Sequence, residues 1–185
     1  VMVEQACEGL AGVSASQVEI QSGIQFYDGI STAEIQEILI KSASDLIDLD
    51  NPNYQYVAAR LLLFSVKKSL YGRMHETPIL KDHVVKCVEK GIYDKEILNL
   101  YDDEEFDKLQ EIIDHNRDYL FTYAGLRQVV DKYLVQDRST GSLYETPQFM
   151  YLLISATIFS KYPKEIRLDY VKKYYDAISK HKINI

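Results

Sequence analysis

The side chains best suited to covalent catalysis are few in this sequence of 185 residues, and they are scattered. The two cysteines, Cys7 and Cys87, lie far apart and form no CxxC pair. A nucleophilic cysteine needs a neighbouring base and an oxyanion site, and the sequence around each thiol has no signature of either. Unpaired cysteines are typical of a reduced compartment. We therefore expect a cytoplasmic protein in which neither thiol is a nucleophile.

The histidines and acidic residues also lack the spacing of a metal or catalytic site. None of His75, His83, His115 and His181 forms an HxxxH or HExxH pair. His115 lies beside Asp114 and Asp118, which suits either a pH-sensitive cluster or, as we favour, a histidine that bonds locally at a helix end. The acidic run at 101–107 lacks the glycine turn of a calcium loop and is interpreted as a solvated helix start. We expect no metal site and no catalytic residue.

Charge and motifs argue against nucleic acid and membrane partners. The net charge is -7, and no GxGxxG or GxxxxGK[ST] loop is present. The segment YVKKYYDAISKHK at 170–182 combines tyrosines with lysines, as single-strand binding proteins do. Its tyrosines recur at helical spacing, however, so we favour a helix packed on a core. The apolar run at 149–159 is too short to span a bilayer.

The elements that must position these residues are mostly helices. Ser31 and Glu34 form a capping box, and Asn51 with Pro52 opens a helix that Gly72 ends. Further helices begin at Pro78, in the acidic run at 101–107, at the YAGL segment of 123–126, at Pro147 and at Lys164. Short β-prone runs around Gly141 predict one small β-hairpin near 133–145. With 46% hydrophobic residues, the chain is expected to be a mainly α helical bundle of two blocks.

Four segments, in order and at consistent spacing, resemble the N-terminal region of the large, catalytic subunit of class I ribonucleotide reductase. They are YQYVAARLLLFSVKKSLYG at 54–72, NRDYLFTYAGLRQVVDKYLVQD at 116–137, YETPQFMYLLISATIFSKYP at 144–163 and RLDYVKKYYDAIS at 167–179. The resemblance implies that residues 1–72 are the helical portion of an ATP-cone without its N-terminal strands. It implies that residues 78–185 are the all-helical domain that flanks the catalytic barrel.

The resemblance also implies what the longer parent protein does. The family reduces ribonucleoside diphosphates to deoxyribonucleotides for DNA replication, with thioredoxin or glutaredoxin as reductant and with ATP and dATP as allosteric effectors. Its partners are the catalytic barrel of the same parent chain, a radical-generating small (beta) subunit and a second large subunit in a homodimer. The family's reactive cysteines belong to the barrel and the far C-terminus, and Cys7 and Cys87 match none of them. The fragment alone is therefore expected to be inactive and to hold no cofactor.

Two residues match the family's allosteric nucleotide site. Thr32 aligns with a nucleotide-contacting threonine at a helix N-terminus, where phosphate oxygens bind well. Lys68 aligns with a phosphate-contacting lysine. An ordinary cap threonine and an ordinary helix-end lysine are the alternatives. Gln36 and Ser65 occupy positions that the family often fills with histidine, which is a departure from its pattern. The alternative function is a helical protein-interaction module that binds no nucleotide.

Overall fold

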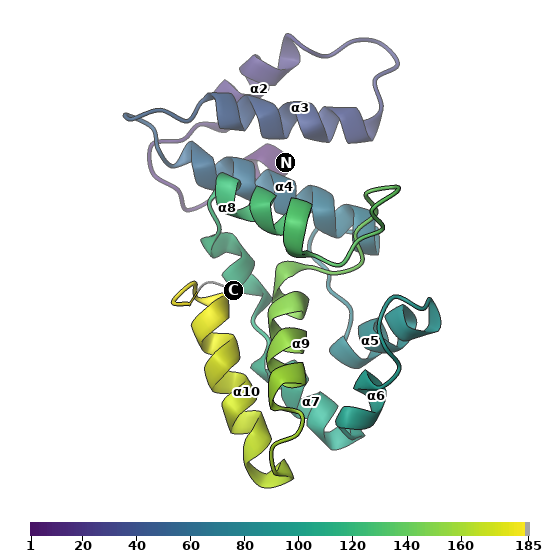
Figure 1. Cartoon of the computed structure of the whole chain (residues 1–185). Helices are drawn as coiled ribbons and strands as arrows, with labels where there is room; N and C mark the ends of the chain where they lie inside the picture. The colour runs from purple at the N-terminus through teal and green to yellow at the C-terminus, as the bar shows by residue number, and fades with distance from the viewer. Residues whose placement is uncertain (184–185) are drawn as a thin grey trace. The chain divides into compact units, whose positions relative to one another are not determined.

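The structure is a computed structural model that describes residues 1–183, and it confirms a mainly α fold (Figure 1). The α-helices are α1 (Met2–Cys7), α2 (Ala15–Gly23), α3 (Thr32–Asp45), α4 (Tyr54–Tyr71), α5 (Leu80–Glu89), α6 (Ile97–Leu100), α7 (Asp103–Ile112), α8 (Tyr123–Gln128), α9 (Pro147–Phe159) and α10 (Lys164–Ser179). A 3-10 helix, η1 (His115–Leu120), precedes α8, and a π-helix, η2 (Val129–Tyr133), follows it.

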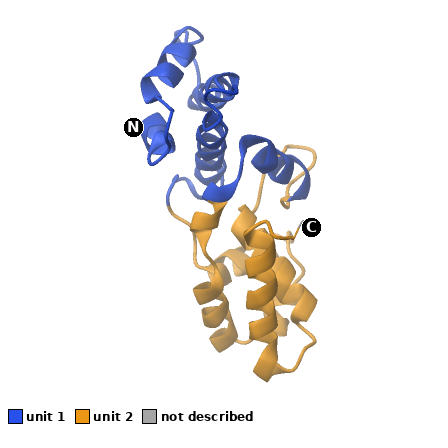
Figure 2. Cartoon of the chain, turned by 90° about the vertical axis from the view of Figure 1, so that its left-hand side faces the viewer, with its two compact units in different colours: residues 1–75, 119–133 blue, residues 76–118, 134–185 orange. Residues whose placement is uncertain are grey.

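The chain divides into two compact units (Figure 2). Unit 1 consists of Val1–His75 and Tyr119–Tyr133, and unit 2 of Glu76–Asp118 with the chain from Leu134 onward. The first boundary between the units, at His75 and Glu76, falls between the two domains proposed from the sequence, 1–72 and 78–185. Those domains are contiguous in sequence, whereas unit 1 takes in a second segment because α8 packs on α4. The assignment of the two domains to named functions remains a proposal.

Helix α4 is the core of unit 1. Val57, Leu61 and Leu63 are fully buried on it, and α1, α3 and α8 pack around it. A short connection at 46–53 reverses the chain, so α3 and α4 run in opposite directions. The guanidinium of Arg60 donates to the carbonyl oxygens of Ala6 and Glu8, at 3.1 and 2.6 Å. These bonds satisfy the free carbonyl groups at the end of α1, where a cation also favours the helix dipole.

Three helix boundaries in unit 1 test the capping predictions. The capping box is confirmed, because the Ser31 hydroxyl accepts from the Glu34 N–H at 3.2 Å and the Glu34 carboxylate accepts from the Ser31 N–H at 2.9 Å. Gly72 ends α4 with φ 75°, a left-handed conformation that glycine adopts without steric cost. The predicted start of α4 at Pro52 is wrong by two residues, because 51–53 form a separate turn before the helix begins at Tyr54.

Helix α9 is the core of unit 2. Phe149 and Leu152 are fully buried, and α10 packs along the helix. The Tyr101 hydroxyl donates to the Ala156 carbonyl at 2.7 Å, which joins the segment before α7 to the same helix. Pro147 stands in the first turn, as predicted. Most of the apolar run of this helix is thus buried, and Thr157 and Ile158 near its C-terminal end are exposed.

The predicted β-hairpin near 133–145 is not confirmed. Among the described residues, this segment contains an isolated antiparallel bridge between Gln136 and Leu143 and no extended strand. The Tyr144 N–H donates to the Val135 carbonyl at 3.0 Å, and Gly141 lies in the turn with φ 73°. The chain does reverse here, and the Asp137 N–H donates to the Ser142 carbonyl at 2.9 Å, but helical structure persists to Tyr133 and the pairing beyond it stays a single bridge.

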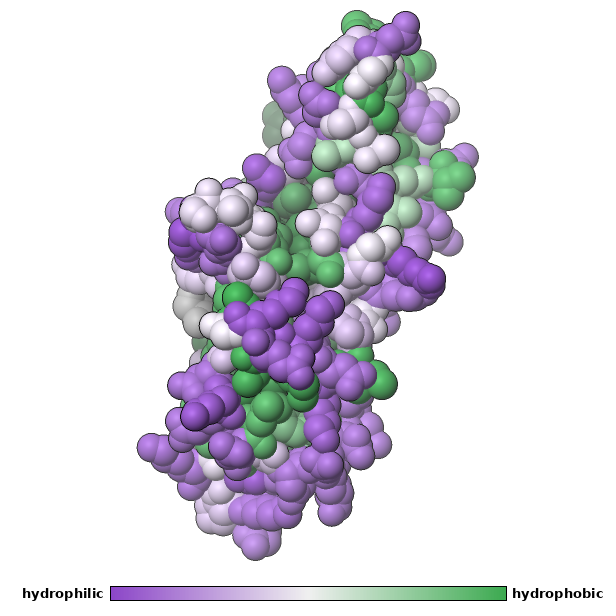
Figure 3. Space-filling view, turned by 90° about the vertical axis from the view of Figure 1, so that its right-hand side faces the viewer, coloured by the Kyte–Doolittle hydropathy of each residue, from purple (hydrophilic) through white to green (hydrophobic). Residues whose placement is uncertain are grey.

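Apolar residues gather in several separate places among polar ones on the face seen in Figure 3. Within residues 1–183, no helix is both long and apolar enough to cross a membrane.

Candidate functional site

The structure brings the two predicted site residues to the same edge of unit 1. Thr32 is the first residue of α3 and Lys68 lies in the last turn of α4, and both are exposed. Between them, the Ser65 hydroxyl donates to the Gln36 side-chain oxygen at 3.4 Å. Thr32 is four residues before Gln36, and Lys68 is three residues after Ser65, so each shares a helix face with one partner of this bond. We call these four residues the effector edge.

The start of α3 gives the effector edge a partly positive end. The first backbone N–H groups of a helix attract anions, and the Lys68 ammonium adds a full positive charge. Glu34 lies at the same end, however. Bonds from the Ser31 hydroxyl and N–H, and then from the Tyr27 hydroxyl at 3.1 Å, lower the pKa of the Glu34 carboxyl. An anion that binds here therefore meets an ionised carboxylate beside the helix end.

The adjacent lysine does not belong to the effector edge. Lys67 is buried, and its ammonium lies 6.0 Å from the centre of the Tyr119 ring. Arg60, on the same side of α4, lies 5.5 Å from that ring. These two cations hold the segment at Tyr119 against α4 through cation–π contacts.

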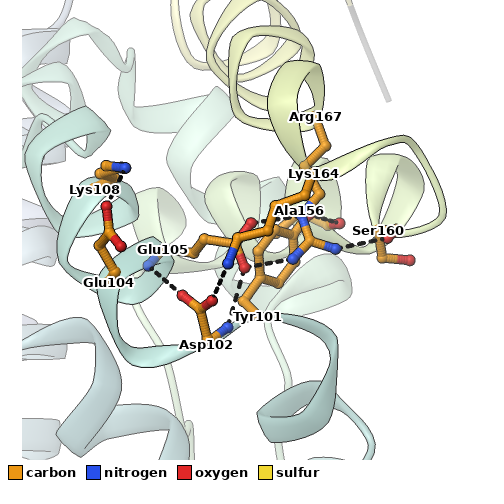
Figure 4. Close-up of polar contacts among 9 residues, drawn as sticks. All are labelled: Tyr101, Asp102, Glu104, Glu105, Lys108, Ala156, Ser160, Lys164 and Arg167. Atoms are coloured by element: carbon orange, nitrogen blue, oxygen red, sulfur yellow. Dashed lines mark hydrogen bonds and ion pairs between the residues drawn. The ribbon is translucent and has the colours of Figure 1, made fainter.

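Unit 2 contains a buried ion pair that the sequence analysis missed (Figure 4). Glu105 is 2% exposed and accepts from the Arg167 Nε at 2.6 Å, while a second guanidinium nitrogen bonds the other carboxylate oxygen. The guanidinium carbon lies 4.5 Å from the centre of the Tyr101 ring. Glu105 also completes a capping box with Asp102. The prediction of a solvated start for α7 is therefore wrong for this residue, which joins α7 to α10.

A second buried network surrounds Cys87. The Tyr93 hydroxyl donates to the Glu145 carboxylate at 2.5 Å and lies 3.2 Å from His83 Nε2, which is 3.9 Å from the Cys87 sulfur. Burial, with smaller effects of Lys86 and His115, lowers the pKa of His83 to about 4. Burial also raises the pKa values of Cys87 and Glu145. The lowered pKa of His83 and the raised pKa of Cys87 both work against transfer of the thiol proton to this histidine, so the pair is poorly suited to generate a reactive thiolate.

The sequence suggested two roles for His115, a pH-sensitive cluster with Asp114 and Asp118 or a local bond at a helix end, and the structure shows what surrounds its ring. His115 begins η1, and its ring packs edge-on against Phe149 at 5.0 Å. His83 stacks on the same phenylalanine at 4.4 Å, with the rings nearly parallel. Asp118 accepts a hydrogen bond from the Gln148 amide at 2.9 Å. Both histidine rings therefore contribute to the core around α9.

Metal ligands do not converge in the described part of the chain. No group of three or more His, Cys, Asp or Glu side chains within residues 1–183 is placed to hold an ion. The effector edge is the candidate ligand site because the exposed Lys68 ammonium and the N–H groups at the start of α3 can meet an anion, although the ionised Glu34 lies beside them.

Comparisons with known proteins match both parts of the chain. The family described as "ATP cone domain" matches residues 2–69, and "Ribonucleotide reductase, all-alpha domain" matches residues 119–185. The chain is 53% identical to ribonucleoside-diphosphate reductase 1 subunit alpha of Escherichia coli K12 over 184 residues, which is 100% of this chain and 24% of that protein. The corresponding subunit alpha of Haemophilus influenzae is also 53% identical, with the same coverage. That of Enterobacteria phage T4 is 42% identical over 94% of this chain and 23% of its own length. The chain thus spans about a quarter of the length of the curated relatives it matches.

Proposed function

Because the chain belongs to the ribonucleotide reductase large-subunit family, we propose that it is the effector-sensing part of an enzyme that reduces ribonucleoside diphosphates to deoxyribonucleotides. The match to an ATP cone over residues 2–69 carries this proposal. The similar proteins are named for diphosphate reduction, and the chain aligns with them along its whole length. Control by ATP and dATP is the function proposed for unit 1.

At the effector edge, Thr32 and Lys68 are proposed to bind the phosphates of the effector. The Thr32 hydroxyl and the first N–H groups of α3 supply neutral donors, and the Lys68 ammonium supplies charge. The bond between Ser65 and Gln36 holds α3 and α4 together next to these groups. A ligand that touches both helices can therefore stabilise one arrangement of them over another, which is what an allosteric effector requires.

The remaining partners are proposed from the family. They are the catalytic barrel of the same parent chain, a radical-generating beta subunit, and a second alpha subunit in a homodimer, in the cytoplasm. The reducing thiols are proposed to lie outside these 185 residues. Cys87 is poorly suited to redox work because burial raises the pKa of its thiol.

Titration of dATP by calorimetry, into the full-length alpha subunit and into this chain, tests the proposal. The full-length protein should bind dATP, and its reduction of a ribonucleoside diphosphate with beta subunit and dithiol should fall as dATP is added. This chain should show no turnover and only weak binding, because it spans 24% of the similar subunit and its proposed phosphate contacts are exposed. Micromolar binding by the chain would mean that the helices alone form the pocket. A full-length protein that does not bind dATP would favour the protein-interaction module.

A further inference from the structure

We propose that the segment Tyr119–Tyr133 carries the effector signal out of unit 1, and that Tyr119 is the positioning residue that couples this segment to α4. The segment belongs to unit 1, but its neighbours in sequence, up to Asp118 and from Leu134 onward, belong to unit 2. A shift of the segment is therefore passed covalently into unit 2 at two junctions. The inference rests on the proposed function, because it requires that an effector binds at the effector edge.

Helix α4 carries the contact to Tyr119 next to the effector edge. The Arg60 guanidinium and the Lys67 ammonium lie 5.5 and 6.0 Å from the centre of the Tyr119 ring. These two cations are seven residues apart and share one face of the helix. Lys68 directly follows Lys67 and lies on the adjacent face. A movement of α4 that follows phosphate binding at Lys68 therefore moves both cations relative to the ring.

The contact at Tyr119 is built to hold one position and has room for a second. Lys67 is buried, and a cation that is shielded from water attracts an aromatic ring more strongly than an exposed one. The half-buried Tyr119 also lines an open cavity of about 340 Å³, together with Gln5, Glu8, Arg60, Phe64 and His75. The ring thus has two places, over the cations or in the cavity, and effector binding shifts the balance between them.

Both ends of the segment are helical turns that differ from an α-helix. The 3-10 helix η1 (His115–Leu120) crosses the first junction, and the π-helix η2 (Val129–Tyr133) ends at the second. Turns of these two kinds often mark hinges and functional sites. Between them α8 packs on α4, and its Leu126 is fully buried (Figure 1). We therefore expect α8 to move with α4 and the two turns to change with it.

Substitution of Tyr119 in the full-length alpha subunit tests the inference, with dATP binding and dATP inhibition measured separately. Tyr119→Leu keeps an apolar side chain and removes the ring from the two cations. Calorimetry should give a dissociation constant for dATP close to that of the wild type, because the effector edge is intact. The ratio of ribonucleoside diphosphate reduction without dATP to that at saturating dATP should fall toward one. Allosteric couplings change such a ratio by about 5–150-fold, and the variant should lose most of this change.

Three further variants separate the role of the ring from a general loss of structure. Tyr119→Phe keeps the ring over both cations and should be inhibited as the wild type is. Lys67→Met removes the buried cation, keeps a side chain of similar length, and should weaken inhibition without weakening dATP binding. Tyr123→Leu is the matched control, because this tyrosine begins α8 in the same segment and has no cation over its ring within residues 1–183. It should change neither binding nor inhibition.

Full inhibition of Tyr119→Leu by bound dATP would overturn the inference, while inhibition of the wild type would show that the proposed function still stands. A parallel loss of dATP binding and inhibition in this variant would also overturn it, because Tyr119 would then support the binding site itself. Equal losses of inhibition in Tyr119→Phe and Tyr119→Leu would exclude the ring as the coupling group. A wild type that does not bind dATP would overturn both proposals together.

Discussion

At the residue scale, the proposed function depends most on Lys68, which is the exposed cation of the effector edge. Replacing Lys68 by alanine in the full-length protein removes a charge-assisted contact to phosphate, worth about 1.5–3 kcal/mol. The dATP concentration for half-inhibition should therefore rise by about tenfold to a hundredfold. The measurement is ribonucleoside diphosphate reduction against dATP concentration at fixed ATP.

A second lysine on the neighbouring helix controls for a general loss of positive charge. Lys41 is exposed on α3, away from the four residues of the effector edge. Lys41→Ala should leave the dATP inhibition curve unchanged. An unchanged curve for Lys68→Ala as well would remove Lys68 from the effector site.

Contacts between residues close in sequence could be predicted, whereas distant ones could not. Ser31 and Glu34 were paired correctly because the two partners of a capping box lie within one helical turn. The pairing of Glu105 with Arg167 joins residues 62 apart, and no local pattern indicates it. Thr32 and Lys68 are proposed through resemblance to a family, since neither residue type at its position marks a nucleotide site by itself.

At the element scale, the attachment of α7 to α10 should depend on pH through Glu105. Burial raises the pKa of this carboxyl, but bonds from Arg167 and from the Asp102 N–H outweigh it, so the pKa falls below its ordinary 4.5. Its contribution to stability is therefore present above pH 4.5 and is lost as the pH falls through the lowered value. Glu105→Gln leaves Arg167 without its carboxylate and should cost about 3 kcal/mol of unfolding free energy at pH 7.

Urea unfolding of the wild type and of the Glu105→Gln variant at pH 7 and at pH 3 checks this prediction. The loss of unfolding free energy caused by the substitution should be smaller at the lower pH. Glu104→Gln is the matched control, because this carboxylate is 75% exposed and pairs with Lys108 on the surface of the same helix. An exposed pair contributes at most about 1 kcal/mol, so the control should change little. A cost that is the same at both pH values would contradict the role given to the ionised Glu105.

Glu145, which joins the segment between α5 and α6 to the start of α9, should depend on pH in the opposite direction. Burial raises the pKa of its carboxyl despite bonds from Tyr93 and the Val135 N–H. The folded state therefore favours the protonated form, and stability is lost as the pH rises from 4.5 through the raised value. Glu145→Gln keeps an oxygen for the Val135 N–H and removes the charge. It should stabilise unit 2 at pH 7.5 relative to wild type.

Thermal melts between pH 5 and pH 8 check this prediction, because the variant should lose less stability over that range than the wild type. Glu145→Ala is the control, since it removes the acceptor as well as the charge and should destabilise at every pH. A wild type whose stability does not fall with rising pH would show that Glu145 stays ionised at no cost.

The helices of the chain were predicted more reliably than the segment between α8 and α9. Caps and proline positions marked the starts of α3 and α9, because these signals act within a single turn. The β-prone residues at 132–136 also suited a hairpin. Packing of Val129 and Val130 in unit 1 extends the helical structure as a π-helix instead, and tertiary contacts of this kind override local preference.

At the scale of the whole molecule, unit 1 is built from two separate stretches of the chain. We therefore predict that the chain cannot be cut into two halves that fold independently. Residues 119–133 belong to unit 1 although they follow much of unit 2 in sequence. Leu126 is fully buried, and α8 packs on α4, so a fragment of residues 1–75 would expose the face of α4 that α8 covers. Such a fragment should melt at a lower temperature than the intact chain or should self-associate through the uncovered face.

Circular dichroism and light scattering of the fragment 1–75, with and without a peptide of residues 116–137, measure this effect. The peptide should restore helical signal and reduce self-association, because it supplies α8 and η2. A peptide with Leu126→Asp is the control and should restore neither, since a charge would have to be buried at a position with no exposure. A fragment that melts cooperatively at the temperature of the intact chain, without peptide, would show that residues 1–75 form a complete domain.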